Sequence, residues 1–184
     1  VDQSGSMKNA DVFGHRTRSR AAYYVIASEI IGKQLHYDLC SSRDVVTLID
    51  MRDSEAQIVV DKEPISWELY NYFVGLAEDP LRPRGHGYFK PALSKAIASL
   101  LSTDNANVAS YLLFLTDSKP SEGKLRGGYD QSKGMVRAIN LLSKKMGNRL
   151  TLGFFGFGSE EFPLLHRMTQ SSNNCGSIAF CENG

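Results

Sequence analysis

Three oxygen-bearing side chains occupy every second position near the start of the chain, in the segment Asp2-Gln3-Ser4-Gly5-Ser6. Alternate positions of an extended turn point the same way, so Asp2, Ser4 and Ser6 can face one spot. Hard cations such as Mg²⁺ prefer oxygen ligands at about 2.0 to 2.1 Å and usually keep several waters. The spacing therefore suits a cation site, although the same residues before a helix also suit an N-cap or an Asx-turn.

A second carboxylate follows a continuous apolar run much later in the chain. The run Tyr-Leu-Leu-Phe-Leu-Thr over 111–116 is typical of a strand that is buried on both faces of a parallel sheet. Asp117 follows it directly and should lie at the carboxyl edge of the sheet, where ligands of α/β proteins gather. We therefore predict that Asp117 shares a cation site with the first segment.

Helical and strand patterns alternate along the chain and predict how these side chains are positioned. Three- and four-residue apolar spacing predicts helices over 17–39, 66–77, 91–101, 131–146 and 160–168. Apolar or β-branched runs predict strands over 44–51, 56–60, 111–116, 150–157 and 177–181, the first two forming an antiparallel hairpin. The glycine-rich stretch 118–130 is expected to be a long mobile loop.

This alternation predicts an α/β fold with a doubly wound, mostly parallel sheet, one antiparallel edge strand and helices on both faces. We expect a single domain over 1–184. A central strand should precede the Asp-Ser segment, yet only Val1 stands before Asp2. The expectation is that this strand is cut short before Val1 and that the domain is part of a larger polypeptide.

Composition narrows the classes of partner. With 21 basic and 20 acidic residues the net charge is +1, so we expect no nucleic-acid partner, and the basic groups over 16–20 and 82–84 are expected to be solvated. No apolar run approaches the roughly 18 residues of a membrane span. Three cysteines weakly favour a reducing, intracellular compartment.

The segment Asp-x-Ser-x-Ser-Met before a long helix, with a later strand ending in Leu-Thr-Asp, resembles the metal-ion-dependent adhesion site of von Willebrand factor A domains. The resemblance covers nearly the whole chain. It implies that Asp2, Ser4, Ser6 and Asp117 surround Mg²⁺, or Mn²⁺ or Ca²⁺. It also implies that an open coordination position accepts an exposed Asp or Glu of a protein partner, in a binding module and not an enzyme.

The chain departs from the family in the second loop, which usually supplies a threonine a few residues before an Ala-Leu pair. By spacing from Ala92-Leu93 that position falls on Gly87, and His86 and Tyr88 are neighbours that could donate a replacement group. An imidazole suits zinc or nickel better than magnesium. The missing hydroxyl predicts weaker or more rigid metal binding, and leaves an empty, purely structural site as an alternative.

Other functions remain open on the sequence alone. One alternative is a magnesium-dependent phosphate- or nucleotide-binding α/β domain, which lacks a phosphate-cradling glycine loop here. Another is a metal-free structural scaffold. For the binding module, loops over 9–18, 82–89 and 119–129 would form the rim of the site, and their basic residues would suit an acidic partner.

Overall fold

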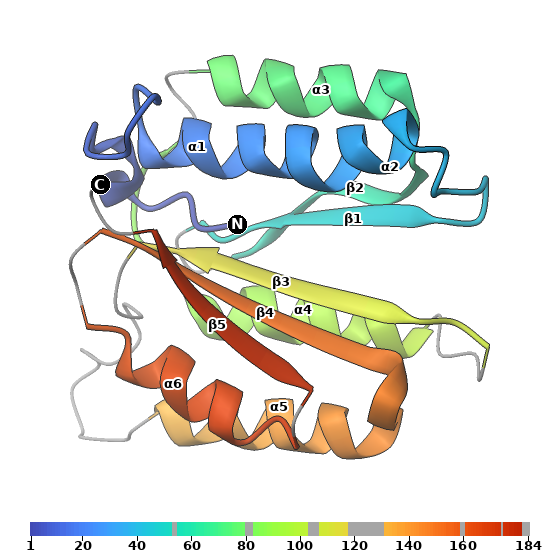
Figure 1. The fold of residues 1–184 in the computed structure, drawn as a ribbon. Helices are drawn as coiled ribbons and strands as arrows, with labels where there is room; N and C mark the ends of the chain where they lie inside the picture. The colour runs from blue at the N-terminus through green and yellow to red at the C-terminus, as the bar shows by residue number, and fades with distance from the viewer. Residues whose placement is uncertain are drawn as a thin grey trace.

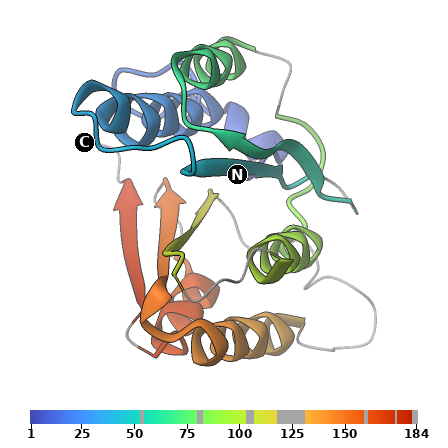
Figure 2. The same cartoon turned by 90° about the vertical axis from the view of Figure 1, so that its right-hand side faces the viewer.

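The computed structural model describes residues 1–52, 55–79, 83–102, 107–117, 131–158, 161–173 and 175–181. Its strands lie between two layers of helices, with α1 and α3 on one side and α4, α5 and α6 on the other (Figures 1 and 2). The stretch 118–130, and with it the predicted rim over 119–129, lies outside the described residues.

The strands form two sheets. Strands β3 (Ser110–Thr116), β4 (Leu150–Phe157) and β5 (Gly176–Cys181) make a parallel sheet in the order β3-β4-β5. Strands β1 (Val45–Asp50) and β2 (Gln57–Pro64) make an antiparallel pair. The parallel strands and the hairpin are thus confirmed, and β2 is longer than the predicted 56–60. The predicted burial of the run 111–116 holds only for its second half, since Tyr111 is 68% exposed.

The segment over residues 1–3 lies between the two sheets. On one side the Asp2 amide donates to the Leu115 carbonyl at 2.8 Å. On the other, the Met51 amide donates to Val1 at 2.9 Å and the Gln3 amide donates to Met51 at 3.1 Å, in a parallel bridge. The predicted single doubly wound sheet is therefore present in part, as two sheets with a short segment bonded to both.

The long N-terminal helix has three consecutive parts, α1 (Arg18–Val25), the π-helical η2 (Ile26–Gly32) and α2 (Lys33–His36). Thr17 caps it, because its hydroxyl accepts a hydrogen bond from the Arg20 amide at 3.0 Å. The helix ends before the predicted residue 39, since Asp38 adopts a positive φ of 54° that cannot continue a right-handed helix.

The remaining helices match their predicted positions within a few residues: α3 (Trp67–Glu78), α4 (Phe89–Ser102), α5 (Gln131–Met146) and α6 (Pro163–Gln170). Ser66 caps α3 by accepting from the Leu69 amide at 3.1 Å. The prediction that the last helix begins at 160 was wrong, because Pro163 suits the first helical position, where its missing N–H leaves no bond unmade.

Neighbouring residues of β3 pack into different cores. Phe114 packs with Phe154 among side chains of α5 and α6, whereas Leu115 belongs to the cluster that contains Tyr23 and Phe73 of α1 and α3. Strand side chains alternate between faces, so helices cover both faces of β3. None of the helices in the described ranges has both the length and the hydropathy of a transmembrane segment.

Candidate metal centre

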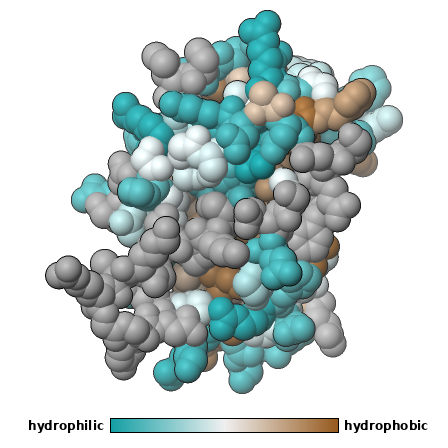
Figure 3. Space-filling view, turned by 90° about the vertical axis from the view of Figure 1, so that its left-hand side faces the viewer, coloured by the Kyte–Doolittle hydropathy of each residue, from teal (hydrophilic) through white to brown (hydrophobic). Residues whose placement is uncertain are grey.

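The candidate site lies where the segment 1–3 and strand β3 end. A short 3₁₀ turn, η1 (Gly5–Lys8), follows Ser4, and its Met7 side chain is fully buried, which fixes the turn to the core. Asp117 directly follows β3. Figure 3 shows this side of the molecule, where the described residues are largely hydrophilic.

The two serines and Asp117 form a chain of oxygen atoms. Ser4 Oγ lies 3.1 Å from Ser6 Oγ, and the Ser6 hydroxyl donates to Asp117 Oδ1 at 2.9 Å. The two ends of this chain are separated by more than 110 positions in sequence. The fold thus joins three of the four predicted ligand residues through their side chains, and the fourth, Asp2, accepts a hydrogen bond from the Ser4 amide.

Asp2 is fully buried and its carboxylate is held on both oxygens. The Ser4 amide donates to Oδ1 at 2.8 Å, and the Thr116 hydroxyl donates to Oδ2 at 2.5 Å. Thr116 immediately precedes Asp117. The end of β3 therefore contacts the Asp2 carboxylate through Thr116 and leads directly into the second carboxylate, Asp117. Sequence reasoning missed Thr116, although its place in the Leu-Thr-Asp triplet was a usable signal.

The spacing of these oxygens fits a hard cation. In an octahedron with metal-to-oxygen distances near 2.1 Å, adjacent ligands lie about 3.0 Å apart. The Ser4-to-Ser6 and Ser6-to-Asp117 separations of 3.1 and 2.9 Å are close to that value. Within the described ranges, no group of three or more His, Cys, Asp or Glu side chains could hold a metal. A cation here would depend on hydroxyls, at most two carboxylates and water.

The second loop lies against the first. The Arg84 amide donates to the Gln3 carbonyl at 2.7 Å, and the Gly5 amide donates to the Gly85 carbonyl at 3.0 Å. Gly87 then faces Asp2 so closely that a Cβ there would lie 3.0 Å from Asp2 Oδ1. The absence of a side chain at this position therefore makes room for the Asp2 carboxylate.

The other two candidate substitutes lie differently. The His86 side chain is exposed and its ring packs edge-on against Tyr88, with centroids 6.3 Å apart. His86 forms no acidic or imidazole cluster with Asp2 and Asp117 among the described residues. A role for His86, Gly87 or Tyr88 as a metal ligand remains a prediction.

A buried arginine borders the site, contrary to the expectation that the basic group over 16–20 is solvated. Arg18 is 7% exposed. Its Nη1 donates to Asp117 Oδ2 at 2.8 Å, while Nε donates to Asp11 Oδ1 at 2.7 Å and Nη2 bonds the second Asp11 oxygen. The guanidinium therefore bridges two carboxylates, and the Asp117 oxygen that it bonds is not the one that faces Ser6.

Gly158 provides the space for this guanidinium. The residue follows β4 with a φ of +91°, a conformation that residues with a side chain rarely adopt. A Cβ built there would lie 2.5 Å from Arg18 Nη2. The missing side chain just after β4 thus leaves the space that the Arg18 side chain, from the start of α1, occupies.

The electrostatics of the site follow from burial and from Arg18. Burial raises the pKa of Asp117, and the hydrogen bond from Arg18 acts in the opposite direction. The pKa of Arg18 is raised, chiefly by its hydrogen bond with Asp11. Burial disfavours the charged form of each group, whereas pairing between the guanidinium and a carboxylate favours the charged form of both. Arg18 is a fixed counter-charge that favours the ionised form of Asp117, which is the form that binds a cation.

Comparisons with known proteins show what the fold resembles. No family model and no curated protein matches the sequence. The solved SpRpn10 VWA domain matches with a TM-score of 0.68 at 16% identity, over 100% of this chain and 85% of that one. Manganese-loaded TRAP protein of Plasmodium vivax matches with a TM-score of 0.61 at 16% identity, over 98% of this chain and 66% of that one. A von Willebrand factor type A structure from Catenulispora acidiphila matches with a TM-score of 0.58 at 14% identity, over 97% of this chain and 36% of that one.

Proposed function

Since the chain has the fold of von Willebrand factor A domains, we propose that it is a protein-interaction module that holds one divalent cation, Mg²⁺, Mn²⁺ or Ca²⁺. The observation that carries the proposal is the contiguous set of Ser4 Oγ, Ser6 Oγ and Asp117 Oδ1, spaced like octahedral ligands. The manganese-loaded state of the TRAP structure supports it. An acidic side chain of a protein partner would complete the coordination.

We infer that residues 1–3 act as the central strand of one doubly wound sheet in the order β2-β1-(1–3)-β3-β4-β5. The hydrogen bonds of Val1, Asp2 and Gln3 to both neighbours support this. The chain runs from that segment to β1 and β2 on one side, and then crosses through α3 and α4 to β3 on the other side. In open α/β sheets, ligands bind at such a switch point, beyond the carboxyl ends of the strands. The proposed cation position is at that edge.

Each residue has a distinct part in the proposed site. Ser4, Ser6 and Asp117 would bind the cation directly. Asp2 would act through its charge and through bound water, because its oxygens accept from the Ser4 amide and the Thr116 hydroxyl, neither of which is a proposed ligand. The Asp117 oxygen that faces the site bonds instead to Ser6, which is itself a proposed ligand. A bound cation would attract the partner carboxylate, and no residue of the set is proposed as a nucleophile or general base.

The test is a metal titration followed by thermal unfolding. Wild type is expected to gain about 2.7 kcal/mol at a metal concentration one hundred times the Kd, or roughly 5 to 10 °C in Tm for a domain of this size. Asp117→Asn should abolish the gain while keeping side-chain shape. Asp44→Asn is the matched control, because that carboxylate bonds only locally, to Ser41, in an exposed turn. A wild-type Tm that does not respond to Mg²⁺ or Mn²⁺ contradicts ion binding.

The same assay separates the proposal from the other two functions. A scaffold without an ion gives no shift with either metal. A nucleotide-binding domain gives a further shift when ATP is added to the magnesium-loaded protein. For the proposed module we expect acetate, and not ATP, to displace water from bound Mn²⁺, which water-proton relaxation measures directly.

The missing loop hydroxyl can be restored at Gly87. We expect Gly87→Thr to bind Mn²⁺ several-fold more tightly than Gly87→Val, which adds similar bulk without a hydroxyl, because oxygen is the preferred ligand. Both variants should lose about 1 to 3 kcal/mol of stability, since a Cβ there approaches Asp2 to 3.0 Å. Equal affinities for the two variants in calorimetry would show that the hydroxyl has no part in binding.

A further inference from the structure

A second surface, remote from the candidate metal centre, has a concentrated positive charge. Helices α5 and α6 contain five lysines and arginines and no acidic residue. The rest of the chain has 16 basic and 20 acidic residues, so its net charge is negative. Such segregation within a chain of net charge +1 is a local feature of these two helices and not a consequence of composition.

Four polar side chains form a stripe along α5. Lys133, Arg137, Asn140 and Lys144 are spaced by four, three and four residues, the spacing that keeps side chains on one face of a helix. The stripe is about 16 Å long, because a helix rises about 1.5 Å per residue. Among the described residues, none of its three cations forms a salt bridge.

The stripe borders a hollow between α5 and α6. This hollow has a volume of about 430 Å³ and is lined by three basic residues, one apolar residue and two neutral polar residues: Lys133, Arg137, Arg167, Val136, Asn140 and Ser171. The Asn140 amide donates to the Ser171 carbonyl at 2.9 Å, and Arg167 Nη2 donates to Ser132 Oγ at 2.8 Å. These bonds join the two helices, so the hollow is formed before any ligand arrives.

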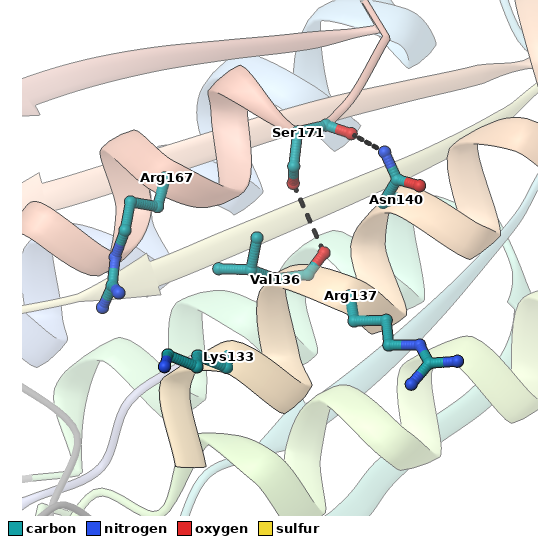
Figure 4. A pocket seen from close by; sticks show the side chains of 6 residues that line it. All are labelled: Lys133, Val136, Arg137, Asn140, Arg167 and Ser171. Atoms are coloured by element: carbon teal, nitrogen blue, oxygen red, sulfur yellow. Dashed lines mark hydrogen bonds between the residues drawn. The ribbon is translucent and has the colours of Figure 1, made fainter. Parts of the chain in front are cut away.

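The arrangement of the cations favours an extended ligand over a single anion. In Figure 4 the charged ends of Arg167, Lys133 and Arg137 lie apart along the hollow and do not converge on one point. Leu141, next to the stripe on the same helix, is 56% exposed. Neither helix contains a Phe, Tyr or Trp on which a base could stack. The surface therefore combines spaced positive charge with an apolar contact.

We propose that the stripe over Lys133–Lys144 and the adjoining hollow dock an acidic segment of a partner protein, one with several carboxylates and an apolar side chain among them. Carboxylates would pair with Lys133, Arg137 and Lys144, and the apolar side chain would cover Leu141. Charge complementarity of this kind guides association and selects partners. The docking requires no cation and is separate from the Asp2 and Asp117 site.

Fluorescence anisotropy in EDTA tests this surface without involving the metal centre. The probes are a labelled helical peptide of about 14 residues with Glu at every fourth position and one Leu, the same peptide with Gln for Glu, and a labelled single-stranded DNA. We expect the Glu peptide to bind at least about tenfold more tightly than the Gln peptide, and more weakly as salt rises.

Variants locate the binding. The double variant Lys133→Glu with Arg137→Glu should weaken binding of the Glu peptide by about tenfold or more. Leu141→Ala should weaken the same binding several-fold. Lys33→Glu with Arg43→Glu, an equal charge change in α2 and in the turn before β1, should leave binding unchanged. Circular dichroism checks that each variant is folded. Absence of Glu-peptide binding, equal losses in both double variants, or DNA binding that is tighter than peptide binding would each overturn the proposal.

Discussion

Replacing Arg18 with Met is expected to lower the free energy of unfolding in EDTA by about 3 to 5 kcal/mol. The guanidinium pairs with Asp117, whose side chain is completely buried, and its loss would leave that carboxylate uncompensated. Met fills a similar volume without charge, so the measured loss reports the charge and its hydrogen bonds. Urea unfolding followed by circular dichroism gives the value.

A neighbouring arginine on the same helix provides the control. Arg20 pairs with Glu78 at the surface, where the two side chains are 27% and 53% exposed, and Arg20→Met should cost at most about 1 kcal/mol. Magnesium should stabilise Arg18→Met more than it stabilises wild type, because the metal would then replace the positive charge that Arg18 supplies to Asp117. An Arg18→Met protein as stable in EDTA as Arg20→Met would refute the role given to Arg18.

The second large effect is expected at Gly158. Gly158→Ala should cost about 2 to 4 kcal/mol, since the residue has a φ of +91° and the new Cβ would lie 2.5 Å from Arg18 Nη2. The cost has two parts, backbone strain and displacement of the guanidinium from its carboxylates. Urea unfolding measures the sum.

A double-mutant cycle separates these parts. In the Arg18→Met background, Gly158→Ala should cost only about 1 to 2 kcal/mol, the backbone share, because the guanidinium it displaces is absent. Gly147→Ala, at another positive-φ glycine with no atom near its Cβ position, estimates the backbone share independently. Strict additivity of Arg18→Met and Gly158→Ala would show that the two residues do not act together.

The sequence predicts best what depends on local pattern. Strand β3 and helix α5 were placed within a residue or so, since an apolar run of only six residues has the length of a strand and a steady helical spacing indicates a helix. The meeting of Ser6 with Asp117 could also be anticipated, because a side chain that follows a buried parallel strand lies at a known edge of the sheet.

What could not be predicted depends on contacts between distant segments. Arg18 lies in an arginine-rich stretch that is typical of a solvated helix face, and only its joint contacts with Asp11, Asp117 and Gly158 explain its burial. The π-helical η2 has the same apolar spacing as an ordinary helix, so periodicity does not reveal it. Gly87 was placed by spacing alone, but its closeness to Asp2 depends on how two loops stack.

The segment over residues 1–3 has a mechanical consequence. The Asp2 amide bonds laterally to Leu115 on one side, and Val1 and Gln3 bond to Met51 on the other. A partner that pulled along the segment at the carboxyl edge would load these lateral bonds in shear. Tension at Asp2 would thus be divided between the two halves of the molecule, and a break on one side would leave the other side still attached.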